Sequence, residues 1–570
     1  MLLKRLSKEK QSSRSILYLL STTMPNIIQA LKENISCDIF DDEKTRNAYK
    51  HDASVFEIVP QAVVIPKTIE DIEDLVHFVK LRKKKHPELS LTPRAAGTCM
   101  SGGSLTDSIM IDIKNFDKIE IHTNFAKVGP GAFYRDFEKE LDKNNVMYPP
   151  YPSSKLICKI GGMVANNAGG EKSLGYGKTE NFVEELEVVL ADGKTYTIKK
   201  ITKEELLKKC GQENFEGELY VQLYHLLDKN SDLIKNSKPQ VSKNSTGYNI
   251  WKIWDGEYFD LSQLFVGSQG TLGIITEVKF KILPKIKHRG MLIAYLDNFD
   301  NIPEIVKTVM AHNPNSFETY DDNTLRLALK YFYGFSKSLH KNQISLFKDF
   351  FPDFIYSTIH GMPKLTLIVE YENNDLHTIH ENLKKLKNEL TIFKNVKTKI
   401  AKNEGERKKY WAIRRESFNL LRLRVKGMYA PAFIDDTVVN TDVLSEFFPK
   451  IYKILNESGL TMTIAGHIGN GNFHIFPLMD LSQETNRKKI YELNQKVFDL
   501  VLSYKGSISG EHNDGLIRSP YIKEQFGSKI YNIFAEIKHI FDPEGIFNPH
   551  KKIGVTKEYA QKFLINHKPI

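Results

Sequence analysis

The 570-residue sequence contains little cysteine and no long uninterrupted apolar run. Its four cysteines, Cys37, Cys99, Cys158 and Cys210, lie far apart and form no Cys-x-x-Cys pair. This spacing argues against a disulfide framework and against a cysteine-held iron–sulfur cluster of the usual kind, and it fits a reducing compartment. No apolar run approaches the roughly 18 residues of a membrane-spanning helix, so an integral membrane protein is not expected.

The charge balance argues against nucleic-acid binding. Eighty basic and 70 acidic residues are interspersed, which leaves a formal net charge of +10 that a solvated surface explains. We expect a cytoplasmic protein. Because of the basic clusters at 82–85 and 407–409, peripheral contact with an anionic membrane surface is the alternative. In the basic, serine-rich segment 1–23, the apolar run Ile16–Leu20 is too short for a signal peptide, and a transit peptide stays an alternative.

The length predicts more than one domain, because a single hydrophobic core rarely grows to this size. The pattern of residue types changes near Pro284, where the glycine-rich segments end and alternating amphipathic helices and strands begin. We therefore place the main domain boundary there. We predict a helical N-terminal extension at 1–55, a first domain at 56–285, a second domain at 286–555 and a C-terminal tail at 556–570.

The second domain alternates amphipathic helical patterns with short strands, which indicates a layered α+β fold. The helical patterns lie at 301–312, 376–390, 441–458 and 482–504. The expected strands are 290–296, 365–371, 461–465 and 473–478.

Three glycine-rich segments lie in the first domain. Residues 94–103 stand between two apolar strands, and their small side chains let backbone N–H groups point inward, as in phosphate-binding loops. This order is not the Rossmann fingerprint, which needs a helix after the glycines, and an ordinary tight turn is the alternative. Residues 149–177 are expected to be one long loop, which is uncommon in a compact domain unless it wraps a ligand. Residues 264–284 alternate glycine turns with β-branched residues.

Two histidine-containing motifs in the second domain predict a metal site. His467 and His474 flank a glycine-rich turn, and Glu511 follows 37 residues after His474. Two imidazoles and a carboxylate can hold a divalent cation, with Zn²⁺ or Mn²⁺ expected, and leave coordination positions open. His512 projects to the opposite side of an extended segment from Glu511, so it could face a substrate as a base. The alternative is two glycine-rich loops with incidental histidines.

Together these motifs resemble the flavin-dependent oxidoreductases of the vanillyl-alcohol-oxidase type. Over about residues 50–555 the chain is similar to the FAD-linked D-2-hydroxyacid dehydrogenases, which include D-lactate dehydrogenase, the glycolate oxidase flavoprotein subunit and D-2-hydroxyglutarate dehydrogenase. The resemblance implies an α+β fold, in which a two-subdomain FAD-binding domain precedes an α+β cap, the FAD-linked oxidase C-terminal domain. The implied FAD-contacting residues are Arg94, Ala95, Ala96, Gly97, Thr98, Gly102, Gly103, Pro150, Ile160, Gly161, Gly162, Ala165, Asn166, Asn167, Gly169, Gly170, Gly175, Gly177, Gly270, Gly273, Ile274, Ile275 and Asn548.

The resemblance also implies roles for single residues. Thr98 stands where covalent members carry a histidine, so FAD is expected to bind non-covalently. Arg414, in a W-x-x-R segment, matches the family's substrate-binding arginine; Arg415 is the neighbouring candidate, and an exposed basic helix is the alternative. For Asn548, a plain turn is the alternative to a flavin contact.

The resemblance further implies that the metal site binds substrate. His467, His474 and Glu511 would hold the cation and, through it, the substrate's carboxylate and 2-hydroxyl. His512 would take the hydroxyl proton while hydride passes to the flavin.

Departures from the family pattern affect the expected substrate. Asn470 replaces a frequent aspartate, Phe476 replaces an asparagine of some D-2-hydroxyglutarate dehydrogenases, and residues 429–433 lack their distal-carboxylate lysine. These changes favour D-lactate or a longer apolar 2-hydroxyacid, with D-2-hydroxyglutarate and glycolate as alternatives.

The resemblance also bears on the electron acceptor. Several motifs resemble the branch in which the flavoprotein is fused to a cysteine-rich electron-transfer half, which this sequence lacks. A separate iron–sulfur protein, quinone or cytochrome is therefore expected as acceptor, and a dehydrogenase rather than an oxidase. Two readings of another class stay open: a metallohydrolase, which leaves the glycine-rich segments unexplained, and a non-catalytic FAD-fold assembly subunit, against which the intact histidine and glutamate set argues.

Overall fold

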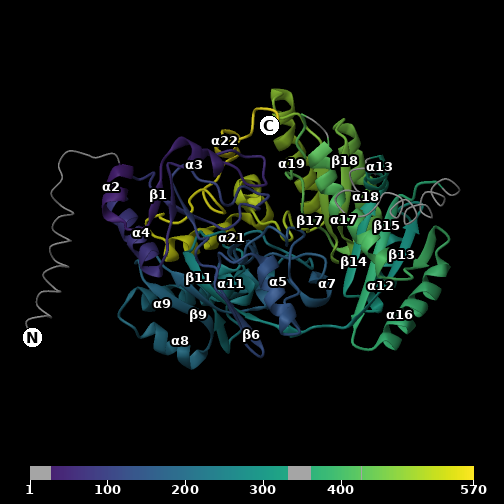
Figure 1. Ribbon diagram of the computed structural model, residues 1–570, viewed down its shortest axis with the longest axis horizontal. Coiled ribbons are helices and arrows are strands. Elements are labelled where there is room, and N and C mark those ends of the chain that lie inside the picture. The colour runs from purple at the N-terminus through teal and green to yellow at the C-terminus, as the bar shows by residue number, and fades with distance from the viewer. Residues whose placement is uncertain (1–26, 331–360, 425–426, 570) are drawn as a thin grey trace, which may run out of the picture.

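The computed structural model describes residues 27–330, 361–424 and 427–569. The elements of the first half lie on the left in Figure 1, and the large sheet of the second domain lies on the right. Within the described residues, no helix is long and apolar enough to cross a membrane.

The first domain begins with a four-stranded sheet. One of its inner strands, β4, pairs in parallel with the strand on each side of it. Helix α4 (Ile69–Arg82) connects two of its strands, and Thr68 and Asp71 form a capping box at its N-terminus, as the sequence predicts. In spatial order the strands are β1 (Asp38–Phe40), β2 (Ala62–Ile65), β4 (Ile109–Asp112) and β3 (Leu91–Arg94).

The N-terminal extension is not purely helical, contrary to the prediction. Helices α2 (Ile27–Asn34) and α3 (Glu43–Ala48) flank β1, which pairs antiparallel with β2 as an edge strand of the first sheet. Because β1 is only three residues long, its apolar pattern is too short to be recognised in sequence. The predicted segment 1–26 lies outside the described residues.

A second, antiparallel sheet of six strands completes the first domain. Its spatial order is β10 (Tyr258–Asp260), β9 (Thr195–Thr202), β8 (Val183–Val189), β11 (Ile274–Lys281), β6 (Phe125–Val128) and β5 (Ile119–Ile121). The remaining elements are α5 (Tyr134–Lys143), α8 (Lys203–Cys210), α9 (Phe215–Lys229), α10 (Ser231–Ser237), α11 (Ser262–Phe265) and the small pair β7 (Val146–Met147) and β12 (Leu283–Pro284).

The segment 149–177 is not one long loop, which corrects the prediction. It forms two short helices, α6 (Ile160–Asn166) and α7 (Ser173–Tyr176). A Cβ at Gly161 would lie 2.8 Å from Pro130 Cβ, so glycine at this position permits α6 to pack closely on its neighbours. Many glycines concealed the helices because glycine has a poor helix propensity.

The second domain is built on a seven-stranded antiparallel sheet. Its order is β16 (Val396–Ile400), β13 (His288–Leu296), β15 (Leu365–Asn373), β14 (Ser316–Asp321), β18 (Met462–His467), β19 (Asn472–Pro477) and β17 (Thr437–Val438). The four expected strands are confirmed to within a few residues.

Helices cover both faces of this sheet. Alternate residues of β13 join two separate cores: Leu292 and Leu296 pack with one set of helices, and Met291 and Tyr295 with the other. The first set contains α12 (Ile302–Ala311), α16 (Leu376–Glu389), α18 (Leu444–Glu457) and α19 (Glu484–Ser503), which confirms the predicted helices. The second contains α13 (Asp322–Lys330) and α17 (Glu404–Arg424).

The last part of the chain returns to the first domain. Helix α21 (Ile522–Phe541), drawn yellow in Figure 1, lies among the N-terminal elements, and Phe534 belongs to the core of the six-stranded sheet. Phe547 belongs to the core of the four-stranded sheet. The remaining α-helices of the described residues are α20 (Gly515–Arg518) and α22 (Lys557–Gln561). The two domains are therefore not simple consecutive segments of the chain.

Candidate active site

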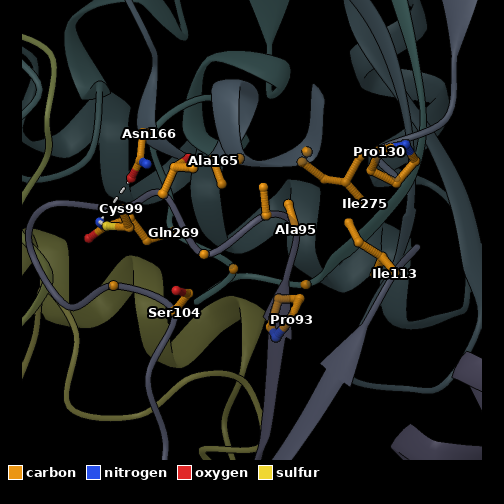
Figure 2. Close-up of a pocket in the computed structure, with 18 residues that line it drawn as sticks. Pro93, Ala95, Cys99, Ser104, Ile113, Pro130, Ala165, Asn166, Gln269 and Ile275 are labelled. Carbon is orange, nitrogen blue, oxygen red and sulfur yellow. Dashed lines mark hydrogen bonds between the residues drawn. The ribbon is translucent and has the colours of Figure 1, made fainter. Parts of the chain in front are cut away.

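The three glycine-rich segments meet around one cavity in the first domain (Figure 2), with about 670 Å³ of empty volume. This volume includes solvent at the open side of the cavity. Predicted FAD-contacting residues that line it are Ala95, Ala96, Gly97, Thr98, Gly103, Gly161, Gly162, Ala165, Asn166, Gly270, Gly273 and Ile275.

Other predicted FAD-contacting residues lie behind the cavity wall or outside its lining. Arg94 does not line the cavity: its guanidinium donates to the backbone carbonyls of Tyr49, at 3.1 Å, and His51, at 2.5 Å. Asn548 donates to Gly103 O at 2.8 Å and to Gln269 O at 2.6 Å, so it joins two of the glycine-rich segments. The other residues outside the lining are Gly102, Pro150, Ile160, Asn167, Gly169, Gly170, Gly175, Gly177 and Ile274.

The cavity also has lining residues that the sequence prediction missed. Gln269 Nε2 donates to Asn166 Oδ1 at 3.0 Å, and its Oε1 accepts from Gly515 N at 2.8 Å. Its backbone φ of 55° is a left-handed conformation that few non-glycine residues adopt. The glycines on either side of Gln269 are the sequence feature that could have indicated its place in the cavity wall. The remaining missed residues are Pro93, Cys99, Ser104, Ile113 and Pro130.

The predicted metal ligands converge in the second domain. His467 ends β18, His474 lies on β19, and their ligand atoms and that of Glu511 all lie within 4.8 Å of one another. Glu511 Oε1 is 3.1 Å from His467 Nε2, 3.5 Å from His474 Nε2 and 4.0 Å from His512 Nε2. All three imidazoles therefore present Nε2 to the same carboxylate oxygen. The prediction that His512 projects to the opposite side from Glu511 is wrong, because the two side chains approach to 4.0 Å.

Buried carboxylates fix the tautomers of these histidines. Nδ1 of His474 and Nδ1 of His512 donate to the two oxygens of Asp435, at 2.9 and 2.5 Å. Nδ1 of His467 donates to Glu318 on β14, at 2.6 Å. Because each Nδ1 carries a hydrogen, the neutral form of each imidazole has a lone pair on Nε2 for a cation or a proton. In the protonated form Nε2 donates, as Nε2 of His467 does to Glu511 Oε1 at 3.1 Å.

Asp436 positions the backbone of the second motif. Its carboxylate accepts from the backbone N–H of Glu511, at 2.9 Å, and of His512, at 2.7 Å, and from Ser509 Oγ at 2.7 Å. Lys243 is also buried at this site, where its Nζ lies 3.1 Å from Glu511 Oε2. Glu511 therefore faces Lys243 with one oxygen and the histidines with the other.

These contacts shift the pKa values of the site. Burial alone would raise the pKa of Asp435, but His512 and His474 hold it well below its usual range. Burial lowers the pKa of His512, yet Asp435 and Asp436 outweigh this effect and raise it to about 9. Burial lowers the pKa of His474 despite Asp435. The pKa values of this buried site therefore depend on two opposing effects, the burial of each charged group and the attraction between carboxylates and imidazoles.

The histidine cluster and the cavity adjoin one another. A Cβ at Gly169 would lie 2.8 Å from Glu511 Oε2, so the second glycine-rich segment lies directly against this carboxylate. Asn513 Nδ2 donates to Asn166 O at 3.3 Å, and Asn166 itself lines the cavity. A cofactor in the cavity and a cation at the cluster would thus share one region.

The two arginines of α17 differ in their partners. Arg414 Nε donates to Glu318 Oε2 at 3.1 Å, which connects Arg414 through Glu318 to His467. Arg415 forms an ion pair with Glu171 in the second glycine-rich segment. Arg414 is therefore the one linked to the predicted metal site.

The sequence prediction did not include the acidic residues that contact the histidines, although the sequence contains a feature that indicates them. Glu318 is a charged residue in a fully buried strand, and Asp435 and Asp436 stand in an apolar stretch. Buried carboxylates need partners, so acids in apolar stretches point to a polar site. Phe476 stacks near His474 with ring centroids 6.3 Å apart, which places this apolar side chain beside the cluster.

Known proteins share the sequence features of both domains. A family model described as "FAD binding domain" matches residues 60–199, and one described as "FAD linked oxidases, C-terminal domain" matches residues 285–552. Together the two matches cover well over half of the chain.

Curated relatives include three named activities. A D-2-hydroxyglutarate dehydrogenase of Pseudomonas putida is 26% identical over 93% of this chain and 52% of its own length. The glycolate oxidase subunit GlcD of Escherichia coli is 26% identical, covering 94% and 92%. A D-lactate dehydrogenase of Anaerostipes hadrus is 24% identical, covering 94% and 98%. The chain spans about half the length of the D-2-hydroxyglutarate dehydrogenase relatives.

Solved structures share the fold. An alkyldihydroxyacetonephosphate synthase superposes with a TM-score of 0.63 at 17% identity, covering 93% of this chain and 86% of its own. A p-cresol methylhydroxylase superposes with a TM-score of 0.64 at 15% identity, covering 93% and 96%. The expected α+β fold, an FAD-binding domain of the vanillyl-alcohol-oxidase type with an α+β cap, is confirmed.

Proposed function

The chain belongs to the family of FAD-linked oxidases, and we propose that it is a dehydrogenase that oxidises a D-2-hydroxyacid, D-lactate or a similar compound, to the 2-oxoacid. The observation that carries this proposal is the convergence of three Nε2 atoms on one oxygen of Glu511, beside the glycine-lined cavity. Bound FAD would supply the hydride acceptor, a chemistry that no side chain provides.

The cavity residues suit a non-covalent flavin. Small residues such as Ala95, Gly97 and Gly162 leave backbone groups accessible, as a large planar ligand with a pyrophosphate requires. Position 98 is a threonine, so it has no imidazole for a covalent link to the flavin. Gln269 and Asn548 would hold the cavity wall in place through their contacts with neighbouring segments.

The donor set of the histidine cluster suits a divalent cation. Two imidazole nitrogens and one carboxylate oxygen, each held by a buried partner, match the ligands of open zinc sites, and Mn²⁺ is the second candidate. Such a cation would supply Lewis-acid polarisation of the substrate's oxygens. His467, His474 and Glu511 would hold it.

His512 is the proposed base. It is the more exposed of the three imidazoles, with 21% of its side chain accessible, compared with 7% for His467 and His474. Asp435 fixes its ring, and Nε2 of the neutral imidazole, the form that predominates above the pKa of about 9, would take the 2-hydroxyl proton. Arg414 and Lys243 are the cations that would attract the substrate carboxylate, Arg414 as a fork and Lys243 as a point charge.

The surroundings favour a small or apolar substrate end. Phe476 lies beside His474, and an aromatic ring gives a second carboxylate no partner. D-2-Hydroxyglutarate and glycolate are the alternatives within the same chemistry, since relatives carry those names. A separate iron–sulfur protein, quinone or cytochrome would then reoxidise the flavin.

The test is anaerobic mixing of the purified protein with D- and L-lactate, D- and L-2-hydroxybutyrate, D- and L-2-hydroxyglutarate, and glycolate. Flavin absorbance near ~450 nm reports reduction directly. We expect D-lactate or D-2-hydroxybutyrate to bleach the flavin fastest and the L-forms to leave it oxidised. Bleaching by D-2-hydroxyglutarate alone would select the alternative substrate, and no bleaching by any compound would favour a non-catalytic subunit.

A further inference from the structure

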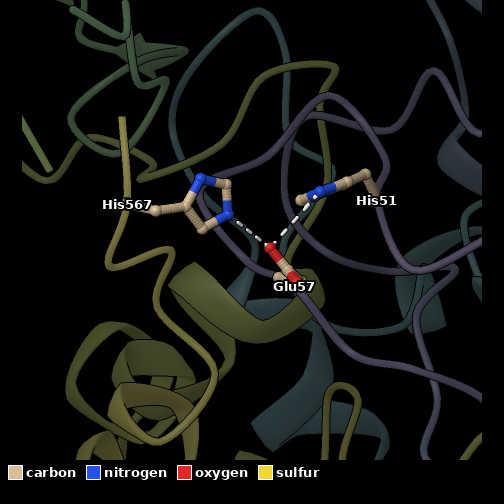
Figure 3. Close-up of side chains that lie close together, drawn as sticks. All are labelled: His51, Glu57 and His567. Carbon is tan, nitrogen blue, oxygen red and sulfur yellow. Dashed lines mark hydrogen bonds and ion pairs between the residues drawn. The ribbon is translucent and has the colours of Figure 1, made fainter. Parts of the chain in front are cut away.

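A second group of metal-ligating side chains lies apart from the active site. His51, Glu57 and His567 approach one another at the surface (Figure 3), with their ligand atoms within 4.8 Å. Glu57 Oε2 is 3.3 Å from His51 Nε2 and 2.8 Å from His567 Nε2. The group shares no residue with the histidine cluster described above.

The backbone holds these three side chains together. His51 and Glu57 face each other across an antiparallel β-bridge, and Phe56 forms a second bridge with Leu564. Glu57 N donates to Phe563 O at 2.8 Å, on the segment that carries His567. The ligands therefore come from three adjacent strands of backbone whose spacing is fixed before any ion binds.

We propose that His51, Glu57 and His567 form a surface site for a divalent transition metal of the Zn²⁺ class, which fastens segment 563–568 to segment 51–57. Two imidazole nitrogens and one carboxylate oxygen select such ions over Mg²⁺ and Ca²⁺, which prefer oxygen ligands. Nδ1 of His567 donates to Lys568 O at 2.9 Å and Nε2 donates to Glu57 Oε2 at 2.8 Å, so a bound cation would replace the hydrogen on Nε2. Water would complete the coordination.

Access and charge at the site are consistent with reversible binding. The side chains of His51, Glu57 and His567 are 36%, 22% and 37% exposed, so an ion can enter without unfolding. Lys50 Nζ lies 2.6 Å from Glu57 Oε1 and competes with a cation for this carboxylate. Removal of that positive charge should strengthen metal binding.

The test is Co²⁺ titration of the full-length, chelator-treated protein, with calorimetry and d–d absorbance as readouts. His567→Ala should reduce the number of tightly bound Co²⁺ ions by one, with affinity at this site at least ~10-fold weaker. His122→Ala is the matched control, since His122 also lies near a surface glutamate, Glu120, at 3.9 Å. The difference in count does not depend on occupancy of the active-site cluster.

Lys50→Gln gives a change in the opposite direction. Loss of one neighbouring positive charge should tighten Co²⁺ binding by ~5-fold, the effect of about 1 kcal/mol between two unit charges in water. Hydrogen exchange of amides 563–567 should slow on addition of Co²⁺ in the wild type and not in His567→Ala. Equal Co²⁺ counts in the wild type and His567→Ala, or weaker binding in Lys50→Gln, would overturn the proposal.

Discussion

Asp435 joins the two histidine motifs of the candidate active site. It is fully buried, and its two oxygens accept from His474 and His512, one a proposed ligand and the other the proposed base. A single carboxylate thereby sets the ring orientation of both imidazoles. Its substitution should disturb cation binding and proton transfer together.

We predict that Asp435→Asn lowers metal affinity and flavin reduction by about 10–100-fold, the usual cost of losing an outer-shell partner. An amide has one acceptor oxygen, so only one of the two Nδ1–H groups keeps its acceptor. Metal content after dialysis and anaerobic stopped-flow reduction are the measurements. Asp442→Asn, at an exposed position in a short 3-10 helix, is the control. Unchanged metal content would contradict the proposed role of Asp435.

His512 carries a separate prediction because it would act on the substrate. His512→Ala should leave FAD bound while flavin reduction by the best D-2-hydroxyacid slows by ~100-fold or more, the scale of general-base catalysis. His377→Ala, at an exposed position on α16, should reduce at the wild-type rate. Reduction of the His512→Ala flavin at a near wild-type rate would remove this residue from the mechanism.

Strand β14 supplies two buried acids with different roles. Glu318 faces the active site, whereas Asp321, at the end of the strand, accepts from Thr324 N at 2.8 Å at the start of α13. Burial raises the pKa of Asp321 to about 7, from an ordinary 3.8. The folded protein therefore binds a proton at Asp321 more tightly than the unfolded chain does.

This shift predicts a pH dependence of stability. Because the pKa of Asp321 is raised on folding, its contribution to stability is lost as pH rises from about 4 to about 7, on the order of 4 kcal/mol in total. Asp321→Asn keeps the acceptor for Thr324 and does not titrate. Its melting temperature relative to the wild type should thus be higher at pH 8 than at pH 5. The exposed Asp297→Asn should show no such trend, and a pH-independent difference for Asp321→Asn would refute the argument.

The two domains are connected by segments that lie in one domain in sequence and pack in the core of the other. Helix α21 follows the second domain in sequence but contributes Phe534 to the core of the first, where it contacts Tyr248 with ring centroids 6.0 Å apart. Phe56, near the start of the first domain, belongs to the core of the second. The integrity of the flavin-binding domain thus depends on residues more than 200 positions beyond its predicted end at 285.

We predict that Phe534→Ala destabilises the first domain by about 3–5 kcal/mol, the usual cost of a Phe→Ala change in a core. Urea titration followed by fluorescence of released FAD measures the effect at the flavin site. Phe40→Ala, with a side chain 38% exposed, should change the midpoint little. A Phe534→Ala midpoint equal to that of Phe40→Ala would show that α21 does not support the flavin-binding domain.

Local patterns in the sequence were sufficient for several conclusions. The amphipathic helices and strands of the second domain follow from side-chain periodicity, which depends only on neighbouring residues. The glycine-rich segments and the residues His467, His474 and Glu511 were identified from residue type and spacing, and the structure brings each set together. Their roles in binding FAD, metal and substrate stay predictions.

Only the tertiary structure revealed the partners that come from distant parts of the chain. Glu318, Asp435 and Lys243 reach the histidines through strand pairing and long-range packing, which residue spacing does not encode. The same holds for His51 and His567, which are separated by most of the chain and meet because β-bridges join their segments. Sequence thus determined the chemistry of each motif, and the fold decided which motifs share a site, because contact depends on the path of the whole backbone.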